Sequence, residues 1–135
     1  MKHFHVTCAI IEREGLVLAT QRSATMSLPN KWEFPGGKID PGETPEECLR
    51  RELLEELAIE VHVGAFLSKN THDYPTFRIT LYPFLCKLVS GEIVLHEHSA
   101  FRWLQPRRLS ELDWAEADVP ILEEYLLRHR DGDDC

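Results

Sequence analysis

One segment, residues 44–57, constrains the fold more than any other part of the sequence. Thr44 is followed by Pro45 and, three positions after the threonine, by Glu47, which is the pattern of a capping box with proline in the first helical turn. Leucines then recur every four residues and form one apolar stripe: Leu49, Leu53 and Leu57. The sequence therefore predicts an amphipathic helix over residues 44–57 that must bury this stripe against another layer.

Strand-like segments lie on both sides of this helix. Apolar runs bounded by turn residues predict strands at 3–12, 16–21, 32–34, 61–67, 77–88, 92–95 and 100–104. Pro35-Gly36-Gly37 is expected to be irregular, because paired glycines and a proline rarely occur inside an element. A short helix is expected within 106–112 and a second long helix over 118–128. This order indicates an α+β fold with a mixed sheet rather than regular βαβ repeats.

Length and charge limit the possible partners. The 135 residues suit one domain, which we place at residues 1–130, with an acidic, disordered tail at 131–135. No apolar run approaches the ~18 residues of a membrane helix, and the apolar stretch at 6–11 is too short for the core of a signal peptide, so we expect a cytoplasmic protein without a membrane partner. The net charge of −8 disfavours polymeric nucleic acid, whose binding needs a basic face. The oligomeric state is left open.

The helix at 44–57 carries an unusual group of acids. Glu52, Glu55 and Glu56 are spaced i, i+3, i+4, so they share one face that borders the leucine stripe. They repel one another, and they lie in the half of the helix where its dipole disfavours anions. A divalent cation would reverse that penalty, and carboxylate oxygens suit Mg²⁺ or Mn²⁺. The alternative is a solvated acidic face with ion pairs through Arg51.

The segment before the helix favours the metal site. Gly37, five residues, Glu43, seven residues, and then Arg51-Glu52-Leu53-Leu54-Glu55-Glu56-Leu57-Ala58-Ile59 together resemble the signature box of the Nudix hydrolase family. Ala58 departs from it, because the family usually has glycine at this helix end. Since alanine can close a helix with some strain, we expect an effect on local geometry and not on chemistry.

The resemblance extends over residues 1–127. The run from Asn30 to Ile39 is similar to the MutT branch, which hydrolyses nucleoside triphosphates, whereas Trp114 to Pro120 is more similar to cytidine-type pyrophosphohydrolases. This resemblance implies an α/β/α sandwich, in which helices flank a mixed sheet, and a loop–helix–loop catalytic motif.

The resemblance also implies roles for individual residues. The metal ligands for Mg²⁺, or Mn²⁺ in its place, would be the Gly36 carbonyl, Glu52, Glu55, Glu56 and Glu97. Gly37 and Glu43 would support the cluster, and Arg51 would orient a glutamate by ion pairing. Substrate would be bound through Arg22 and Lys38 near the phosphates and Asp118 at the base. The general base is expected to be Glu52, with Glu97 as the alternative. His96 and His98 are interpreted as exposed loop residues.

The implied activity is magnesium-dependent hydrolysis of a small nucleotide, a nucleoside triphosphate, to the monophosphate and pyrophosphate. Oxidised or modified nucleotides such as 8-oxo-dGTP are the first expected substrates, and modified CTP or dCTP the second. Two alternatives remain: hydrolysis of another nucleoside diphosphate derivative such as ADP-ribose, and a non-catalytic Nudix module. The intact acid trio disfavours the last, because a silent copy has no physical reason to keep repelling charges.

Overall fold

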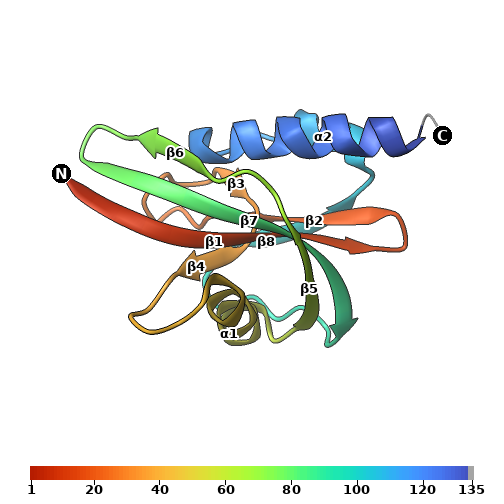
Figure 1. The fold of residues 1–135 in the computed structure, drawn as a ribbon, viewed down its shortest axis with the longest axis horizontal. Coiled ribbons are helices and arrows are strands. Elements are labelled where there is room, and N and C mark those ends of the chain that lie inside the picture. The colour runs from red at the N-terminus through yellow and green to blue at the C-terminus, as the bar shows by residue number, and fades with distance from the viewer. Residues whose placement is uncertain (134–135) are drawn as a thin grey trace.

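The computed structural model describes residues 1–133, with the side chains of residues 1–128. A mixed β-sheet lies between two helices, α1 (Pro45–Leu57) on one side and α2 (Val119–Asp133) on the other (Figure 1). The strands are β1 (Lys2–Arg13), β2 (Leu16–Gln21), β3 (Trp32–Glu33), β4 (Gly36–Lys38), β5 (Glu60–Phe66), β6 (Asn70–Asp73), β7 (Phe77–Ser90) and β8 (Ala100–Leu104). Two 3₁₀ helices, η1 (Pro106–Glu111) and η2 (Glu116–Asp118), precede α2. The predicted fold class is confirmed.

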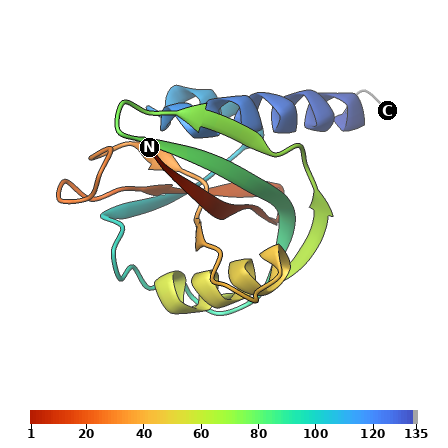
Figure 2. The same cartoon turned by 60° about the vertical axis from the view of Figure 1, so that its left-hand side comes forward.

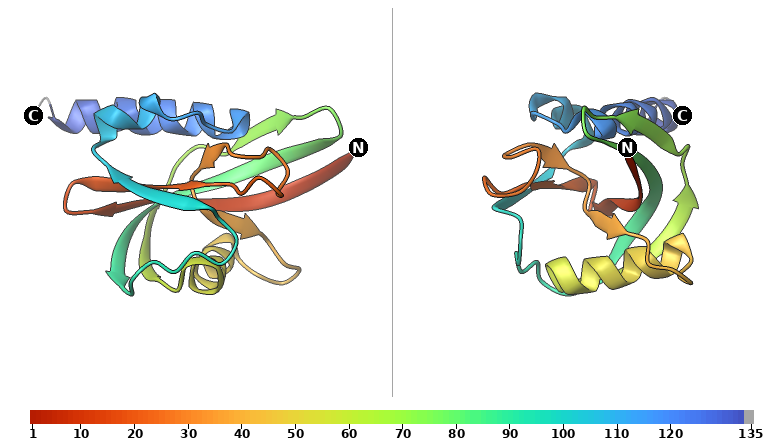
Figure 3. Two further views of the ribbon diagram at one scale, coloured as in Figure 1. Left: turned by 180° about the vertical axis from the view of Figure 1, so that it is seen from behind. Right: turned by 90° about the vertical axis from the view of Figure 1, so that its left-hand side faces the viewer.

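The two longest strands form the spine of the sheet. β1 and β7 run parallel, in register from Lys2 opposite Phe77 to Glu12 opposite Lys87, and the sheet continues in the order β3-β2-β1-β7-β5. The other pairings are antiparallel: β8 joins β2, β6 joins β7, and β4 joins β1. The sheet is strongly curved, and the two helices lie on its two sides (Figures 2 and 3). The pairing of β4 with β1 places Gly36 and Gly37 next to α1.

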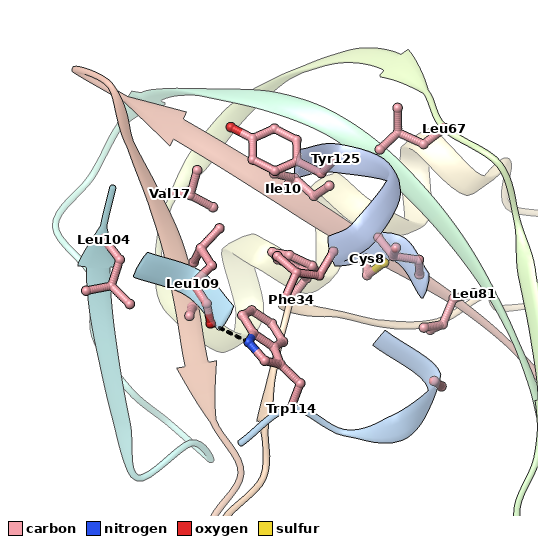
Figure 4. Close-up of a cluster of buried hydrophobic side chains, with 14 of the residues drawn as sticks. Cys8, Ile10, Val17, Phe34, Leu67, Leu81, Leu104, Leu109, Trp114 and Tyr125 are labelled. Carbon is pink, nitrogen blue, oxygen red and sulfur yellow. Dashed lines mark hydrogen bonds between the residues drawn. The ribbon is translucent and has the colours of Figure 1, made fainter. Parts of the chain in front are cut away.

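Each face of the sheet has its own apolar core. The leucine stripe of α1 packs with Ala9, Ile11 and Leu18 on one face, whereas Tyr125 of α2 packs on the other with Trp114 and Phe34. Figure 4 shows this second cluster, in which the Trp114 indole N–H donates to the Leu109 carbonyl at 2.7 Å. Burying each leucine of the stripe contributes about 1.5–3 kcal/mol, so α1 is held firmly on the sheet.

The segment Pro35-Gly36-Gly37 was expected to be irregular, but both of its glycines lie in a strand. Gly36 and Gly37 belong to β4, which pairs with β1 through Thr7 and Cys8. This strand is possible because Gly36 has no Cβ, since a Cβ at this position would overlap the Thr7 carbonyl. The missing side chain therefore allows two backbones to approach closely instead of breaking the strand.

Three other segments also differ from the sequence-based expectation. The strand expected at 92–95 is absent from the described residues, and Val94 N–H instead bonds to the Leu57 carbonyl at the end of α1, at 3.0 Å. The polar strand β6 was not expected, because it has no apolar run. The last helix continues through Asp133, into the expected tail, and residues 134 and 135 lie outside the described residues. Within the described chain, neither helix is both long and apolar enough to cross a membrane.

Candidate functional site

The helix α1 begins as the sequence predicts. The Thr44 hydroxyl accepts from Glu47 N–H at 3.1 Å, and the Glu47 carboxylate accepts from Thr44 N–H at 2.9 Å, so the capping box is formed. The helix ends at Ala58, whose φ of 59° and ψ of 35° are left-handed. This conformation is the one that favours glycine, and the expected strain at Ala58 is therefore present.

Glu52 is packed against the backbone of β4. Its side chain is only 14% exposed, and a Cβ on Gly37 would overlap its carboxyl group. Burial raises the pKa of Glu52, while the hydrogen bond from Arg51 acts in the opposite direction. Gly37 therefore provides the space in which a partly desolvated carboxylate can lie beside the strand.

Arg51 ties the loop before the helix to the glutamates on it. Its guanidinium binds both oxygens of Glu43, at 2.6 and 2.9 Å, and its Nη1 reaches Glu52 at 2.9 Å and Glu55 at 3.2 Å. This pairing, helped by a hydrogen bond from Asp40 N–H, lowers the pKa of Glu43 to about 2. Arg51 therefore orients several carboxylates, as the resemblance implied, and the Glu55 side chain is 60% exposed.

A cavity of about 620 Å³ opens beside this cluster. It is lined by eight of the eleven residues expected at the site: Arg22, Gly36, Gly37, Lys38, Glu52, Glu56, Glu97 and Asp118. The remaining expected residues, Glu43, Arg51 and Glu55, are not among those lining it. Within the cavity wall, burial and the charges of Glu97 and Glu52 raise the pKa of Glu56 to about 7. The acids thus gather at one end of the cavity, where Arg51 pairs with Glu52 and the repulsion of Glu56 by Glu97 and Glu52 remains.

The other end of the cavity is apolar. Its lining includes Phe4, Phe34, Tyr74, Phe77, Ile79 and Leu81. Asp118 is 5% exposed there, and its Oδ2 accepts from Phe34 N–H at 2.9 Å. Burial, followed by the charge of Glu33, raises the pKa of Asp118 well above its usual range. A neutral carboxyl beside aromatic rings can donate a hydrogen bond to a planar ring bound in this space.

Lys38 and Arg22, which were expected to lie near the phosphates, have different surroundings. Lys38 Nζ lies 4.3 Å from the centroid of the Phe4 ring. Arg22 donates to Glu33 at 2.8 Å and to the Ser27 carbonyl at 2.6 Å, so it also ties down the loop that follows β2.

His98 is not the exposed loop residue that was expected. Its side chain is 3% exposed, and its Nε2 lies 2.8 Å from the Glu33 carboxylate. His96 is exposed, as expected. The expectation for His98 was wrong because the segment folds back over β2, where Ser99 N–H bonds to the Gln21 carbonyl at 2.9 Å. Nothing in the local sequence distinguishes the two histidines.

The donor atoms at the acidic end suit a hard divalent cation. Carboxylate and carbonyl oxygens are the ligands that Mg²⁺ prefers, and the raised pKa of Glu56 reflects burial and, after it, anionic neighbours whose charge such a cation would neutralise. As the side chains lie, however, no three acids, histidines or cysteines within residues 1–128 are grouped closely enough to hold a metal ion. Glu52 and Glu55 are both turned toward Arg51, so ligation requires their rotation.

Comparison with known proteins gives consistent matches. Residues 1–125 match the NUDIX domain family. The chain is 37% identical over 126 residues to the CTP pyrophosphohydrolase of Escherichia coli (strain K12), covering 93% of each chain. It is 34% identical over 123 residues to the 8-oxo-dGTP diphosphatase of the same organism, covering 90% of this chain and 95% of the other. The solution structure of the E. coli ORF135 protein superposes with a TM-score of 0.80 at 36% identity, covering 94% of this chain and 91% of that one.

Proposed function

Since the chain belongs to the NUDIX domain family and is a Nudix hydrolase acting on nucleotides, we propose that it converts a nucleoside triphosphate and water to the monophosphate and pyrophosphate. One observation carries this proposal: the cavity joins an acidic end, with Glu52, Glu56 and Glu97, to an apolar end with Asp118. A triphosphate needs a divalent cation at the first end, and a base needs rings and a polar group at the second.

Nudix hydrolases generally depend on a divalent metal, and Mg²⁺ is the ion we propose here, with Mn²⁺ able to replace it. Its proposed ligands are Glu52, Glu55, Glu56, Glu97 and the Gly36 carbonyl. The bound ion would polarise the phosphoryl oxygens and lower the pKa of a water molecule. The position of these ligands depends on Gly37 and Glu43, through the close packing of Glu52 and the clamp of Arg51.

Side chains of the protein take up the proton of the attacking water and offset the negative charge of the phosphates. Water attacks the β-phosphorus, and the bridging oxygen leaves with the nucleoside monophosphate. Glu52 takes the water proton as general base, a role supported by its partial burial and raised pKa, and Glu97 is the alternative. Arg51 orients Glu52, while Lys38 and Arg22 provide positive charge near the phosphates.

The base is proposed to be oxidised or modified. A carboxyl group at Asp118 with a raised pKa can donate to an acceptor on the base edge, and 8-oxo-dGTP is the first candidate. Modified CTP or dCTP is the second candidate, favoured by the similarity to the E. coli CTP pyrophosphohydrolase. The cytoplasmic location expected from the sequence stays a prediction.

A nucleotide panel tests the proposal. The protein is incubated with Mg²⁺ and with 8-oxo-dGTP, dGTP, CTP, dCTP, 5-substituted dCTP and ADP-ribose, and monophosphate, pyrophosphate and orthophosphate are quantified. We expect monophosphate and pyrophosphate in equal amounts, with the highest kcat/KM for a modified triphosphate. Release of orthophosphate from triphosphates, or turnover of ADP-ribose alone, would contradict the proposed reaction. A preference for CTP over 8-oxo-dGTP would select the second substrate.

A further inference from the structure

His98 lies between two carboxylates that both line the cavity. Its Nε2 is 2.8 Å from Glu33 Oε2 on β3, and its Nδ1 is 4.0 Å from Glu56 Oε2 on α1. In the described part of the chain, this Nδ1 is the one buried side-chain nitrogen or oxygen without a hydrogen-bond partner. Buried polar groups are nearly always paired, so an unpaired nitrogen that faces the site points to a partner gained in the working state.

The imidazole ring is fixed from the side opposite Glu56. Glu33 is held by Arg22, which donates to its other oxygen at 2.8 Å, and the Glu33 backbone carbonyl accepts from the Thr20 hydroxyl at 3.1 Å. Because an ionised carboxylate only accepts hydrogen bonds, a ring that contacts both Glu33 and Glu56 must donate from both nitrogens, from Nε2 to Glu33 and from Nδ1 to Glu56. The ring therefore has one orientation, and that orientation directs Nδ1 toward Glu56.

We propose that His98 is a positioning residue that holds the Glu56 carboxylate in its metal-binding orientation, with Glu33 as the group that fixes the ring. This inference rests on the proposed role of Glu56 as a metal ligand. A movement of about 1 Å would bring the 4.0 Å separation to hydrogen-bond length. Residues behind metal ligands act in this way, and their loss typically weakens metal binding by about 10–100-fold.

A purely structural role for His98 makes a different prediction. In that case the ring only pins the segment around Glu97 by its contact with Glu33, and Nδ1 has no function. Two substitutions separate these roles. The amide nitrogen of asparagine lies near the place of Nδ1, and that of glutamine lies near the place of Nε2. H98N therefore retains a polar group toward Glu56, whereas H98Q retains the contact with Glu33.

Metal affinity is the direct measurement. Free Mn²⁺ is followed by electron paramagnetic resonance as it is titrated into protein without nucleotide, and thermal unfolding verifies that each variant is folded. We expect H98Q to raise the Kd for Mn²⁺ by about 10-fold or more and H98N to raise it clearly less. The KM for nucleotide should change little while kcat falls with H98Q. H96N is the matched control, because His96 is exposed on the same segment, and its Kd should equal that of the parent.

The remaining outcomes overturn the inference. Unchanged Mn²⁺ affinity in both variants, equal losses in both, or a larger loss in H98N than in H98Q would each show that Nδ1 does not position Glu56. If neither variant folds, E33M decides: it frees the ring while His98 stays in place, so unchanged Mn²⁺ affinity would overturn the proposal and a weakened affinity would support it. E56Q distinguishes a failure of this inference from a failure of the proposed function. Normal Mn²⁺ affinity in E56Q would show that Glu56 itself is not a metal ligand.

Discussion

Gly37 and Glu52 lie in such close contact that no side chain fits between them: a Cβ on the glycine would overlap the carboxyl group of the glutamate. The contact joins β4 to α1, two elements that are adjacent along the chain but belong to different layers. It fixes where the proposed general base can lie, and it gives a direct test of whether that position is needed.

Gly37→Ala should therefore impair turnover more than it impairs folding. The added methyl group displaces the Glu52 carboxyl, and we expect kcat to fall by about 100-fold, within the range for misplacement of a reacting group. Gly15→Ala is the control, since Gly15 lies in the β1–β2 turn at φ +79° with nothing near its missing side chain. That variant should lose about 1 kcal/mol of stability from backbone strain and keep its activity. Equal kcat values for Gly37→Ala and the parent would contradict the prediction.

Glu52→Gln tests the base more directly. The amide cannot accept the proton of water, so we expect kcat to drop by about 10²–10⁴-fold. The fold should survive, because removal of a partly buried charge offsets the lost contact with Arg51. Steady-state kinetics with Mg²⁺ and thermal unfolding measure the two effects. Glu46→Gln, an exposed change at the start of the same helix, should have no effect, and near-full activity in Glu52→Gln would exclude Glu52 as the base.

The sequence predicts the acidic end of the site better than the apolar end. The capping box and leucine stripe place Glu52 and Glu56 on one face of α1 from local periodicity alone, and the structure confirms that helix. Local patterns, in contrast, carry no information about how Phe77 on β7 comes to line the same cavity as Phe34. That proximity depends on the parallel pairing of β1 with β7, whose register a single sequence does not specify.

Two of the errors have the same origin. A Gly-Gly pair normally disfavours a strand, but here the close approach of β4 to β1 needs glycine at position 36. The loop histidines are indistinguishable by residue type, yet His98 is buried with its ring against Glu33, 65 residues away in sequence. In both cases a long-range contact overrides a local preference.

The stability of the metal-free protein should depend on pH through Glu56. Its pKa is raised from 4.5 to about 7 in the folded protein, so between these pH values the folded state binds more protons than the unfolded state. The free energy of unfolding must then fall as pH rises through that interval, by about 1–2 kcal/mol after allowance for partial solvation. Urea unfolding in EDTA at pH 5 and pH 8 measures this.

Glu56→Gln provides the comparison for that experiment. The variant lacks the titrating group, so the decrease between pH 5 and pH 8 should be smaller than in the parent. Parallel pH profiles for the two proteins would show that Glu56 does not carry the effect.

Ala58→Gly should stabilise the protein without altering activity. Ala58 has a left-handed backbone, with φ 59°, which glycine adopts without the steric penalty, and we expect a gain of about 1 kcal/mol. Ala65→Gly, in an exposed part of β5, is the matched control and should instead lose about 0.5–1 kcal/mol. Urea unfolding gives both values. A loss of stability in Ala58→Gly, or a large change in kcat, would mean that the alanine has a role beyond closing the helix.

Asp118→Ala should change base preference more than phosphate chemistry. The side chain lies at the apolar end of the cavity, where it accepts from Phe34 N–H. Loss of its hydrogen bond to the base should reduce kcat/KM by about 10–100-fold for the preferred nucleotide, since a bond from a polar side chain contributes about 1–3 kcal/mol. Nucleotides that do not use this contact should be affected much less. Kinetics with the nucleotide panel measure this. If kcat/KM fell by the same factor for every substrate, the assignment would be wrong, because Asp118 would then act on the shared triphosphate or on the fold.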